Sequence, residues 1–421
     1  MHVDLLITHA SQLLTIPAHE HGPQRGDRLG DLSIIEDGAL VVSGGTIVDR
    51  GPTVDLAAKY QADQTIDAGG RVVMPGFVDP HTHVVFAGDR ANEFERRIAG
   101  ATYMEIMNAG GGIMSTVRAT RTASVDELVA QTRARLDRML QHGTTTAEAK
   151  TGYGLETQAE LKMLAAIERL DAEHPIDLVP TFLGAHAIPT EYQGREDAYT
   201  DLVVNEMLPA IASRILHPAS FFVDVFCEDG AFTLTQSRRI LVRAKELGFG
   251  LKIHVDEFEP LGGTRLGVEL GAISVDHVVT TPPDEIELLG RSDTIAVSLP
   301  GTPFGLAQRD YTPARAILAA GGALALATDI NPGTTWNESM QMISALACRY
   351  LKLTQAQALA AATINAAYAI GRGGSIGSLE IGKQADVLIM DTPDYRQIGY
   401  RYGTNLVRTV IKRGRIVNQA S

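Results

Sequence analysis

Two histidines lie one residue apart in the segment DPHTH, residues 79–83, directly after the apolar run VVMPGFV. Imidazole nitrogens are common ligands of transition metals. Alternate residues of a strand point to the same side, so His81 and His83 can bind one ion together. A lone histidine at a strand end is more often a hydrogen-bonded structural residue, so the metal-binding interpretation requires further ligands elsewhere in the chain.

Strand-like apolar segments alternate with helical patterns through the middle of the chain. The eight segments are residues 71–81, 144–150, 177–186, 221–229, 250–258, 272–279, 293–301 and 323–333. Between them, residues 124–143 and 235–248 have apolar positions at the three- and four-residue spacing of a helix. This alternation favours a parallel sheet with helical crossovers. An open, doubly wound sheet is an alternative, but eight units in series favour a closed (β/α)8 barrel.

Ionisable residues stand at the ends of seven of these eight segments. They are His81 and His83, Glu148 and Lys150, His186, Glu228 and Asp229, His254, His277, and Asp329. In a barrel, the C-terminal strand ends meet at one mouth, where active sites lie. His254 and Asp329 can therefore join the first two histidines around one ion. Three imidazoles and one carboxylate suit zinc or iron, with an open position for water.

Charge and composition exclude several classes of function. The 421 residues have a net charge of −13, which argues against a nucleic-acid binder because phosphates require a cationic face. No apolar run is long enough for a membrane span, and the first residues lack the basic start of a secretory signal. Two cysteines, Cys227 and Cys348, lie far apart, so we expect no disulfide framework and a cytoplasmic location. For Cys227, near a predicted strand end, a structural thiol is the default.

Both ends of the chain contain short β segments separated by turn residues, such as VDLLITHASQLLTI and NLVRTVIKRGRIVNQ. Neither end is large enough alone for a robust core. We therefore expect residues 1–73 and 375–421 to form one small β-sandwich domain together, and residues 74–374 to form the barrel.

Several segments resemble the amidohydrolase superfamily, whose members are metal-dependent hydrolases on a distorted (β/α)8 barrel. The resemblance lies in PGFVDPHTH, KIHVDEF, SVDHVV and ALATDINPG. A longer ordered set resembles one branch of this superfamily over nearly the whole chain. It comprises residues 79–121, AKTGYGLE, TFLGAHAIP, DVFCEDGAF, HVDEFEPLGG and ATDINPGTTWNESM. The resemblance implies hydrolytic ring opening of 4-imidazolone-5-propanoate, which gives N-formimidoyl-L-glutamate in histidine degradation.

The same resemblance implies one divalent or trivalent metal ion, zinc or iron. The implied ligands are His81, His83, His254 and Asp329, and the implied catalytic residues are Glu257, His277, Asp329 and His186. A bound ion makes water acidic enough to attack an amide near neutral pH. Glu257 or His277 can take the proton of that water, and Asp329 can pass one to the leaving nitrogen. His186 can donate to the ring carbonyl as negative charge accumulates.

The substrate also has a propionate carboxylate, which requires a charge-assisted partner when it is buried. The implied substrate-binding residues are Arg90, Tyr153, His186, Glu257, Asn331, Gly333 and Thr334. Among them, Arg90 is the predicted partner of the propionate. Without the family context, an ordinary loop arginine, a packed tyrosine and an Asn-Pro-Gly turn would explain most of this set.

Two rival interpretations differ in the residues that they require. A deaminase or another cyclic amidase of the same superfamily shares the metal ligands and differs in the substrate loops. A catalytically inactive scaffold is expected to lose metal ligands, and here all four are present. Lys150 is left without a role, because the lysine that bridges two metals in some members lies on another strand. The family also implies a homodimer.

Overall fold

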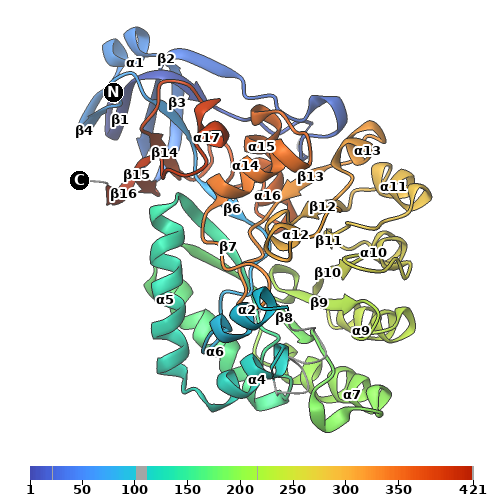
Figure 1. The fold of residues 1–421 in the computed structure, drawn as a ribbon. Coiled ribbons are helices and arrows are strands. Elements are labelled where there is room, and N and C mark those ends of the chain that lie inside the picture. Colours follow the sequence, from blue (N-terminus) through green and yellow to red (C-terminus); the bar gives the residue numbers. More distant parts are fainter. Residues whose placement is uncertain (21, 101–110, 216, 420–421) are drawn as a thin grey trace.

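The structure is a computed structural model that describes residues 1–20, 22–100, 111–215 and 217–419. Its central feature is a sheet of eight parallel strands, in which neighbours in space are neighbours in sequence (Figure 1). The strands are β6 (Phe77–Asp79), β7 (Thr144–Lys150), β8 (Asp177–Ala185), β9 (Phe222–Cys227), β10 (Gly250–Val255), β11 (Ser274–His277), β12 (Ile295–Ser298) and β13 (Leu324–Leu326). Each predicted segment contains one of these strands. The predicted (β/α)8 barrel is confirmed.

The first and last strands of the barrel meet just beyond their C-terminal ends. There the N–H of Asp329 donates to the carbonyl of His81 over 3.1 Å. The N–H of His83 donates to the carbonyl of Ile330 over 3.0 Å. These two bonds place the segment with the two histidines directly beside Asp329.

Helices lie between the barrel strands, after the last of them, and between strands of a second sheet. They are α1 (Thr53–Lys59), α2 (Ala91–Ile98), α4 (Ile113–Thr122), α5 (Val125–Gln141), α6 (Thr157–Glu173), α7 (Glu196–Leu202), α8 (Leu208–Ala212), α9 (Leu234–Glu246), α10 (Gly263–Leu270), α11 (Pro283–Gly290), α12 (Gly301–Gly305), α13 (Ala314–Ala319), α14 (Met340–Tyr350), α15 (Gln355–Ala361), α16 (Ile364–Ala369) and α17 (Gln397–Tyr400). Within the described ranges, none of these helices combines the length and apolar character that a membrane crossing requires.

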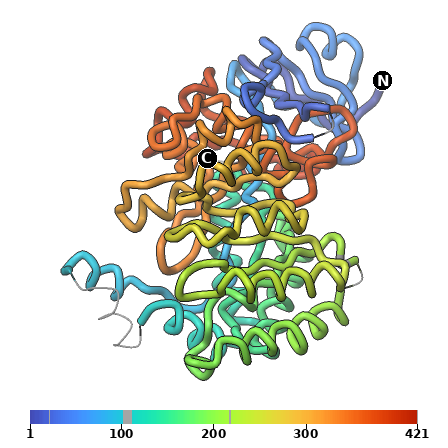
Figure 2. Tube along the Cα trace, turned by 90° about the vertical axis from the view of Figure 1, so that its right-hand side faces the viewer, coloured from blue at the N-terminus to red at the C-terminus, as the bar shows by residue number. Residues whose placement is uncertain are grey.

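Two of these helices, α5 and α9, are the ones that apolar spacing predicts. The start of α5 is a capping box, in which Ser124 and Glu127 each bond the backbone N–H of the other. Helix α2 differs from them, because none of its residues is buried. Figure 2 shows α2 in light blue, projecting from the body of the molecule.

Strands from both ends of the chain form a second sheet, which is mixed. Its strands are β1 (His2–Leu14), β2 (Ile34–Ser43), β3 (Thr46–Pro52), β4 (Gln61–Asp67), β5 (Val72–Pro75), β14 (Val387–Met390), β15 (Val407–Lys412) and β16 (Arg415–Gln419). The order is β16-β15-β14-β5-β1-β2-β3, and β4 pairs with β1. The small β domain built from both termini is therefore present. Its exact limits, at residues 73 and 374, stay a proposal.

The segment predicted as one strand at residues 71–81 is two strands in different sheets. Strand β5 pairs with β1 and β14 in the terminal sheet, and β6 pairs with β7 in the barrel. Gly76 separates them, and a Cβ atom at this residue would lie 2.3 Å from the Thr145 hydroxyl. The close approach of the Thr145 side chain to Gly76 therefore marks the step from one sheet to the other.

The two terminal segments share one core. Leu5, Ile7 and Leu13 of β1 are buried in a cluster with Val387 and Ile389 of β14. Burial of each such side chain contributes about 1.5–3 kcal/mol. Neither segment retains this core without the other.

Lys412, at the end of β15, joins the terminal sheet to the barrel. Its Nζ atom is 2.7 Å from the carbonyl of Thr145 and 2.8 Å from carboxylate oxygens of Asp177 and Asp386. The side chain is only 4% exposed, and Arg413 also bonds both carboxylates.

We expect Lys412→Met to destabilise the protein by about 3 kcal/mol, since removal of one partner leaves buried charge uncompensated. Denaturant unfolding measures this change. Lys245→Met is the matched control, because Lys245 is exposed and donates to the Leu270 carbonyl. An unchanged unfolding midpoint in Lys412→Met would show that the junction does not depend on this cation.

Candidate active site

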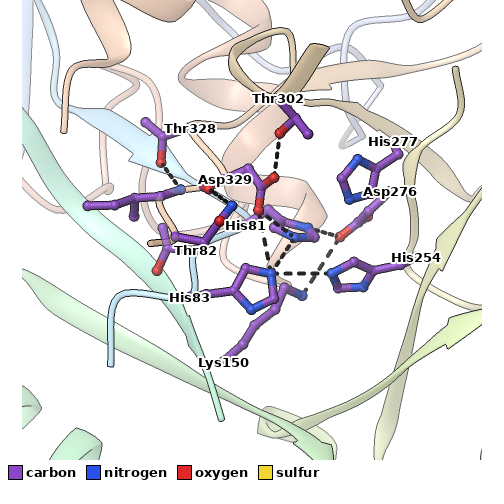
Figure 3. Close-up of polar contacts among 12 residues, drawn as sticks. His81, Thr82, His83, Lys150, His254, Asp276, His277, Thr302, Thr328 and Asp329 are labelled. Carbon is purple, nitrogen blue, oxygen red and sulfur yellow. Dashed lines mark hydrogen bonds and ion pairs between the residues drawn. The ribbon is translucent and has the colours of Figure 1, made fainter. Parts of the chain in front are cut away.

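Three imidazole rings meet at the C-terminal mouth of the barrel (Figure 3). His81 and His83 follow β6, and His254 lies in β10. The Nε2 atom of His83 is 3.3 Å from Nε2 of His81 and 3.4 Å from Nε2 of His254. All three side chains are buried, and their nitrogens are close enough together to hold one metal ion.

Asp329 brings a carboxylate to the same point. Its Oδ1 atom is 3.6 Å from Nε2 of His81 and 3.5 Å from Nε2 of His83. Its other carboxylate oxygen accepts a hydrogen bond from the Thr302 hydroxyl. Asp329 has a φ of 54°, a left-handed conformation that is uncommon outside glycine and typical of functional sites.

The spacing of the three histidines, with Asp329 beside two of them, fits a transition-metal site. A zinc ion binds imidazole nitrogen at about 2.0–2.1 Å, so two ligands at the tetrahedral angle are about 3.3–3.4 Å apart. Four separations between these atoms in this structure run from 3.3 to 3.6 Å. The three histidines are thus brought together in an arrangement that fits a transition-metal ion, and Asp329 lies beside His81 and His83.

Two buried aspartates orient two of the rings. Asp276 accepts a hydrogen bond from Nδ1 of His81 over 2.6 Å, and Asp224 accepts one from Nδ1 of His254 over 3.0 Å. Because a carboxylate accepts, each ring has its proton on Nδ1 and a lone pair on Nε2. Metal-binding histidines commonly have such partners, which fix the tautomer and the direction of the ring.

His83 is oriented by packing instead. Its ring stacks on that of His186, with the centroids 4.7 Å apart and 13° between the planes. Burial lowers the pKa of both His81 and His83 well below the usual value, and the nearby charge of Lys150 adds to this effect. Both rings are therefore neutral, which is the form that binds metal.

A fully buried charge cluster lies behind the aspartates. Nζ of Lys150 is 2.6 Å from Asp224 and 3.0 Å from Glu148. Nζ of Lys252 is 2.9 Å from Glu148 and 3.6 Å from Asp276. Burial opposes the charge on Lys150, but the three carboxylates outweigh it and raise the pKa of Lys150 above its ordinary value. The lysines therefore help to hold both aspartates in place.

Glu257 and His277 face each other beside the metal-binding atoms. Oε2 of Glu257 is 3.5 Å from Nε2 of His277, and the His277 ring centroid is 5.3 Å from that of His254. Burial, followed by the charges of Asp329 and Glu228, raises the pKa of Glu257 well above its ordinary value. Burial likewise lowers the pKa of His277. Both predicted proton-transfer groups therefore lie close to each other and close to the His254 ring.

His186 has a defined tautomer. Its Nδ1 atom is 3.0 Å from the carbonyl of Gly152, and a carbonyl can only accept, so the proton is on Nδ1. Burial lowers the pKa of His186 to about 3, which leaves the ring neutral with an acceptor at Nε2. The predicted donation from His186 to the ring carbonyl would need a proton at Nε2, which this tautomer lacks.

Tyr153 lies next to this histidine, with the ring centroids 5.3 Å apart. The tyrosine is 2% exposed, and burial raises the pKa of its hydroxyl above the ordinary value. The hydroxyl is therefore protonated and can donate. Tyr153 and His186 thus provide a donor and an acceptor next to His83.

Arg90, the residue before α2, lies against the turn that follows Asp329. Its Nε atom donates to the Thr116 hydroxyl over 2.9 Å. A Cβ atom at Gly333 would lie 2.6 Å from Nη1 of Arg90. The glycine is therefore what allows the guanidinium group to lie against this turn.

The side chain of Asn331 holds the same turn together. Its Oδ1 atom accepts from the N–H groups of Gly333 and Thr334, each over 2.8 Å. Its Nδ2 atom donates to the carbonyl of Asp329 over 2.8 Å. The backbone N–H groups of Gly333 and Thr334 are therefore already bonded, so a substrate contact from either would have to replace its bond to Asn331. The turn fixes Asp329 and supports Arg90.

A cavity of about 500 Å³ lies beside Arg90. Its lining includes Arg90, Phe94, Arg97, Gly333, Thr334 and Trp336. The volume suits a small molecule. None of the four predicted metal ligands lines it, so the cavity alone does not define the reaction centre.

Sequence patterns did not single out Asp224, Asp276 or Lys252, although each contacts the site. A signal for them exists, because a charged residue within an otherwise apolar parallel strand is costly to bury without a partner. Lys252 and His254 are two residues apart in β10, which places them on the same side of the strand. Two polar residues at this spacing in an apolar strand, such as Lys252 and His254, therefore indicate the side of the strand that faces the barrel interior.

A (β/α)8 barrel with three buried histidines and an aspartate at its mouth defines a metal-dependent barrel enzyme. A profile of the Amidohydrolase family matches residues 72–417. Imidazolonepropionase of Herpetosiphon aurantiacus is 58% identical over 99% of this chain and 98% of its own length. Imidazolonepropionase of Chloroflexus aggregans is 52% identical over 98% of both. The chain belongs to the amidohydrolase family and, within it, to the imidazolonepropionases.

Solved structures of more distant proteins have the same fold. The 5-methylcytosine deaminase of Klebsiella pneumoniae, liganded with 5-fluorocytosine, aligns with a TM-score of 0.73 and 18% identity over 99% of this chain and 98% of its own. A zinc-bound adenosine deaminase of Xanthomonas campestris aligns with a TM-score of 0.70 and 21% identity over 99% and 93%. At these identities, the likeness extends to the fold alone.

We expect purified protein to contain about one metal ion per chain, because the four converging groups form one site. His254→Ala should lose most of the ion, whereas His9→Ala, a change at an exposed histidine beside Asp37, should retain it. Elemental analysis after dialysis measures the content. Full activity after exhaustive chelation would contradict the assignment.

Proposed function

We propose that this protein hydrolyses the ring of 4-imidazolone-5-propanoate to N-formimidoyl-L-glutamate, a step of histidine degradation. The shared name of its close relatives supports the substrate. The observation that carries the proposal is the metal-binding set flanked by two kinds of groups. Glu257 and His277 lie next to His254, and His186 and Tyr153 lie next to His83. The site therefore offers proton-transfer groups and a donor–acceptor pair for a small polar ring.

We further propose that the ion is a single zinc or iron ion held by His81, His83, His254 and Asp329. Imidazole and carboxylate ligands suit both metals. When bound, such an ion makes water more acidic and polarises a carbonyl. The lone pairs on the three Nε2 atoms and the Oδ1 atom of Asp329 are the groups that would hold it.

The reaction adds one water molecule across a cyclic amide. The water oxygen bonds to the carbonyl carbon, the ring C–N bond breaks, and one water proton moves to the leaving nitrogen. Glu257 and His277 are the groups that take up that proton. Their facing atoms are 3.5 Å apart, and the ring of His277 lies beside that of His254. Asp329, one of the proposed metal ligands, can deliver a proton to the leaving nitrogen.

The donor–acceptor pair orients the ring. In the tautomer found here, Nε2 of His186 accepts a hydrogen bond from a ring N–H. The hydroxyl of Tyr153 donates to the ring oxygen, where negative charge accumulates as water adds. Glu257 can also contact the ring. This assignment reverses the direction of the His186 bond that the sequence leads us to expect.

Arg90 is the proposed partner of the propionate group. Its guanidinium group lies against the turn formed by Asn331, Gly333 and Thr334, which limits its movement. The propionate would lie on the outer side of the ring, away from the metal ligands.

We propose that the protein acts in the cytoplasm as a homodimer, without a nucleic-acid or membrane partner. The net charge of −13 supports the absence of nucleic-acid binding. The thiols of Cys227 and Cys348 are free, which supports a reducing compartment.

We expect the metal-loaded protein to remove the ring absorbance of imidazolone propionate, and Glu257→Gln to slow this turnover roughly 10²-fold or more. Glutamine keeps the shape and removes the base, so metal content should not change. Glu259→Gln, at an exposed neighbour, is the matched control. Loss of metal in Glu257→Gln would place Glu257 among the ligands, and no turnover by the unchanged protein would refute the proposed function.

Loss of Arg90 should raise KM more than it lowers kcat, because the contact forms in the ground state and persists in the transition state. A hydrogen bond to a charged group contributes about 1.5–3 kcal/mol, so kcat/KM should fall about 10- to 100-fold in Arg90→Ala. Arg90→Lys should restore part of this loss, since lysine lacks the bidentate fork. Steady-state kinetics with an analogue that lacks the carboxylate provides the control. Equal losses on both compounds would show that Arg90 only supports the loop.

A further inference from the structure

Two glutamates outside the metal site bind the backbone of the loops that carry Tyr153 and Glu257. Glu160 lies in the first turn of α6 and is 1% exposed. Glu228 follows β9 and is 3% exposed. The carboxylate of each receives several backbone N–H groups from one loop. Burying a carboxylate is costly without such bonds. We therefore ask which loop residues the carboxylates of Glu160 and Glu228 hold in place.

Glu160 holds the loop around Tyr153. Its Oε1 atom accepts from the N–H groups of Gly154 and Leu155, each over 2.8 Å, and its Oε2 atom accepts from Gly152 over 3.1 Å. At Gly154, a Cβ atom would lie 2.6 Å from the Glu160 nitrogen, so only glycine allows this approach. The tyrosine therefore lies between backbone groups that are tied to one carboxylate.

The same loop also orients His186. The carbonyl of Gly152 accepts the hydrogen bond from Nδ1 of His186, and the N–H of Gly152 is held by Glu160. Glu160 thus bonds both neighbours of Tyr153, Gly152 and Gly154, and one of them, Gly152, bonds His186. A shift of this loop would move the Tyr153 hydroxyl and the His186 acceptor together.

Glu228 holds the loop around Glu257. Its Oε2 atom accepts from the N–H groups of Glu257 and Phe258 over 3.1 and 3.0 Å. Its Oε1 atom accepts from Glu259 and Asp229, each over 3.0 Å. The backbone of the proposed proton-transfer residue is therefore bonded directly to a buried carboxylate on the neighbouring strand.

We propose that Glu160 and Glu228 are positioning residues with separate tasks. Glu160 holds the substrate-binding loop with Tyr153, and Glu228 holds the catalytic loop with Glu257. The division of tasks rests on the proposed function, whereas the bonds themselves do not. Neither glutamate touches the substrate, so each acts through the residue that it positions.

Steady-state kinetics of Glu160→Gln and Glu228→Gln tests this division. Glutamine keeps the shape but replaces one oxygen by an NH2 group, so backbone donors would then face a donor. Since small misplacements of reacting groups are costly, Glu228→Gln should lower kcat about 10- to 100-fold and change KM less than about threefold. Glu160→Gln should raise KM about tenfold and leave kcat within about threefold. Each variant is the control for the other.

Double-mutant cycles show through which residue each glutamate acts. Glu228→Gln should have little further effect in the Glu257→Gln background and its full effect in the Tyr153→Phe background. Glu160→Gln should behave in the opposite way. Additive effects in all four combinations, or the same change of KM and kcat in both single variants, would overturn the proposal. The aspartate variants shorten the reach and replace any glutamine variant that does not fold.

Backbone hydrogen exchange provides a readout that does not depend on turnover. In the metal-loaded protein, Glu160→Gln should speed exchange at residues 152–155 alone, and Glu228→Gln at residues 257–259 alone, with metal content unchanged. Unchanged protection in both variants would overturn the proposal. If the unaltered protein fails to open imidazolone propionate while these loop-specific changes occur, the proposed function fails and the loop contacts stand.

Discussion

The site depends on three imidazole rings that are buried and turned toward one another. With Nε2 atoms 3.3 and 3.4 Å apart, three lone pairs converge, an arrangement that has no stability of its own without an ion. Asp276 and Asp224 hold two of these rings from behind, and Lys150 and Lys252 hold the aspartates. The buried charges at the centre of the barrel therefore support the rings of His81 and His254.

The barrel makes this arrangement possible because its strands bring residues that are distant in sequence to one mouth. His81 and Asp329 are 248 residues apart in number, yet the backbone of one bonds the backbone of the other. That bond closes the barrel and sets two ligands side by side. The same interaction thus serves both the fold and the site.

Sequence patterns predicted the barrel, the terminal β domain and the convergence of the four metal-binding groups. These features follow from apolar periodicity and from residues at strand ends, which local reasoning can detect. The division of residues 71–81 at Gly76 could not be predicted in this way, because it depends on contact with Thr145. The His186 tautomer likewise depends on the Gly152 carbonyl, a partner that only the folded chain brings close.

Strand residues and loop residues are held in place by different means. His254 and Asp224 lie within strands whose backbone pairing already sets their positions. Tyr153 and Glu257 lie beyond strand ends, where no ladder of hydrogen bonds continues. A loop at such a place keeps one conformation only if other groups accept its N–H donors, and buried carboxylates do so without adding bulk to the mouth. In a fold that hosts several chemistries, the barrel can then keep the metal ligands constant while the loops around Tyr153 and Glu257 change with the substrate.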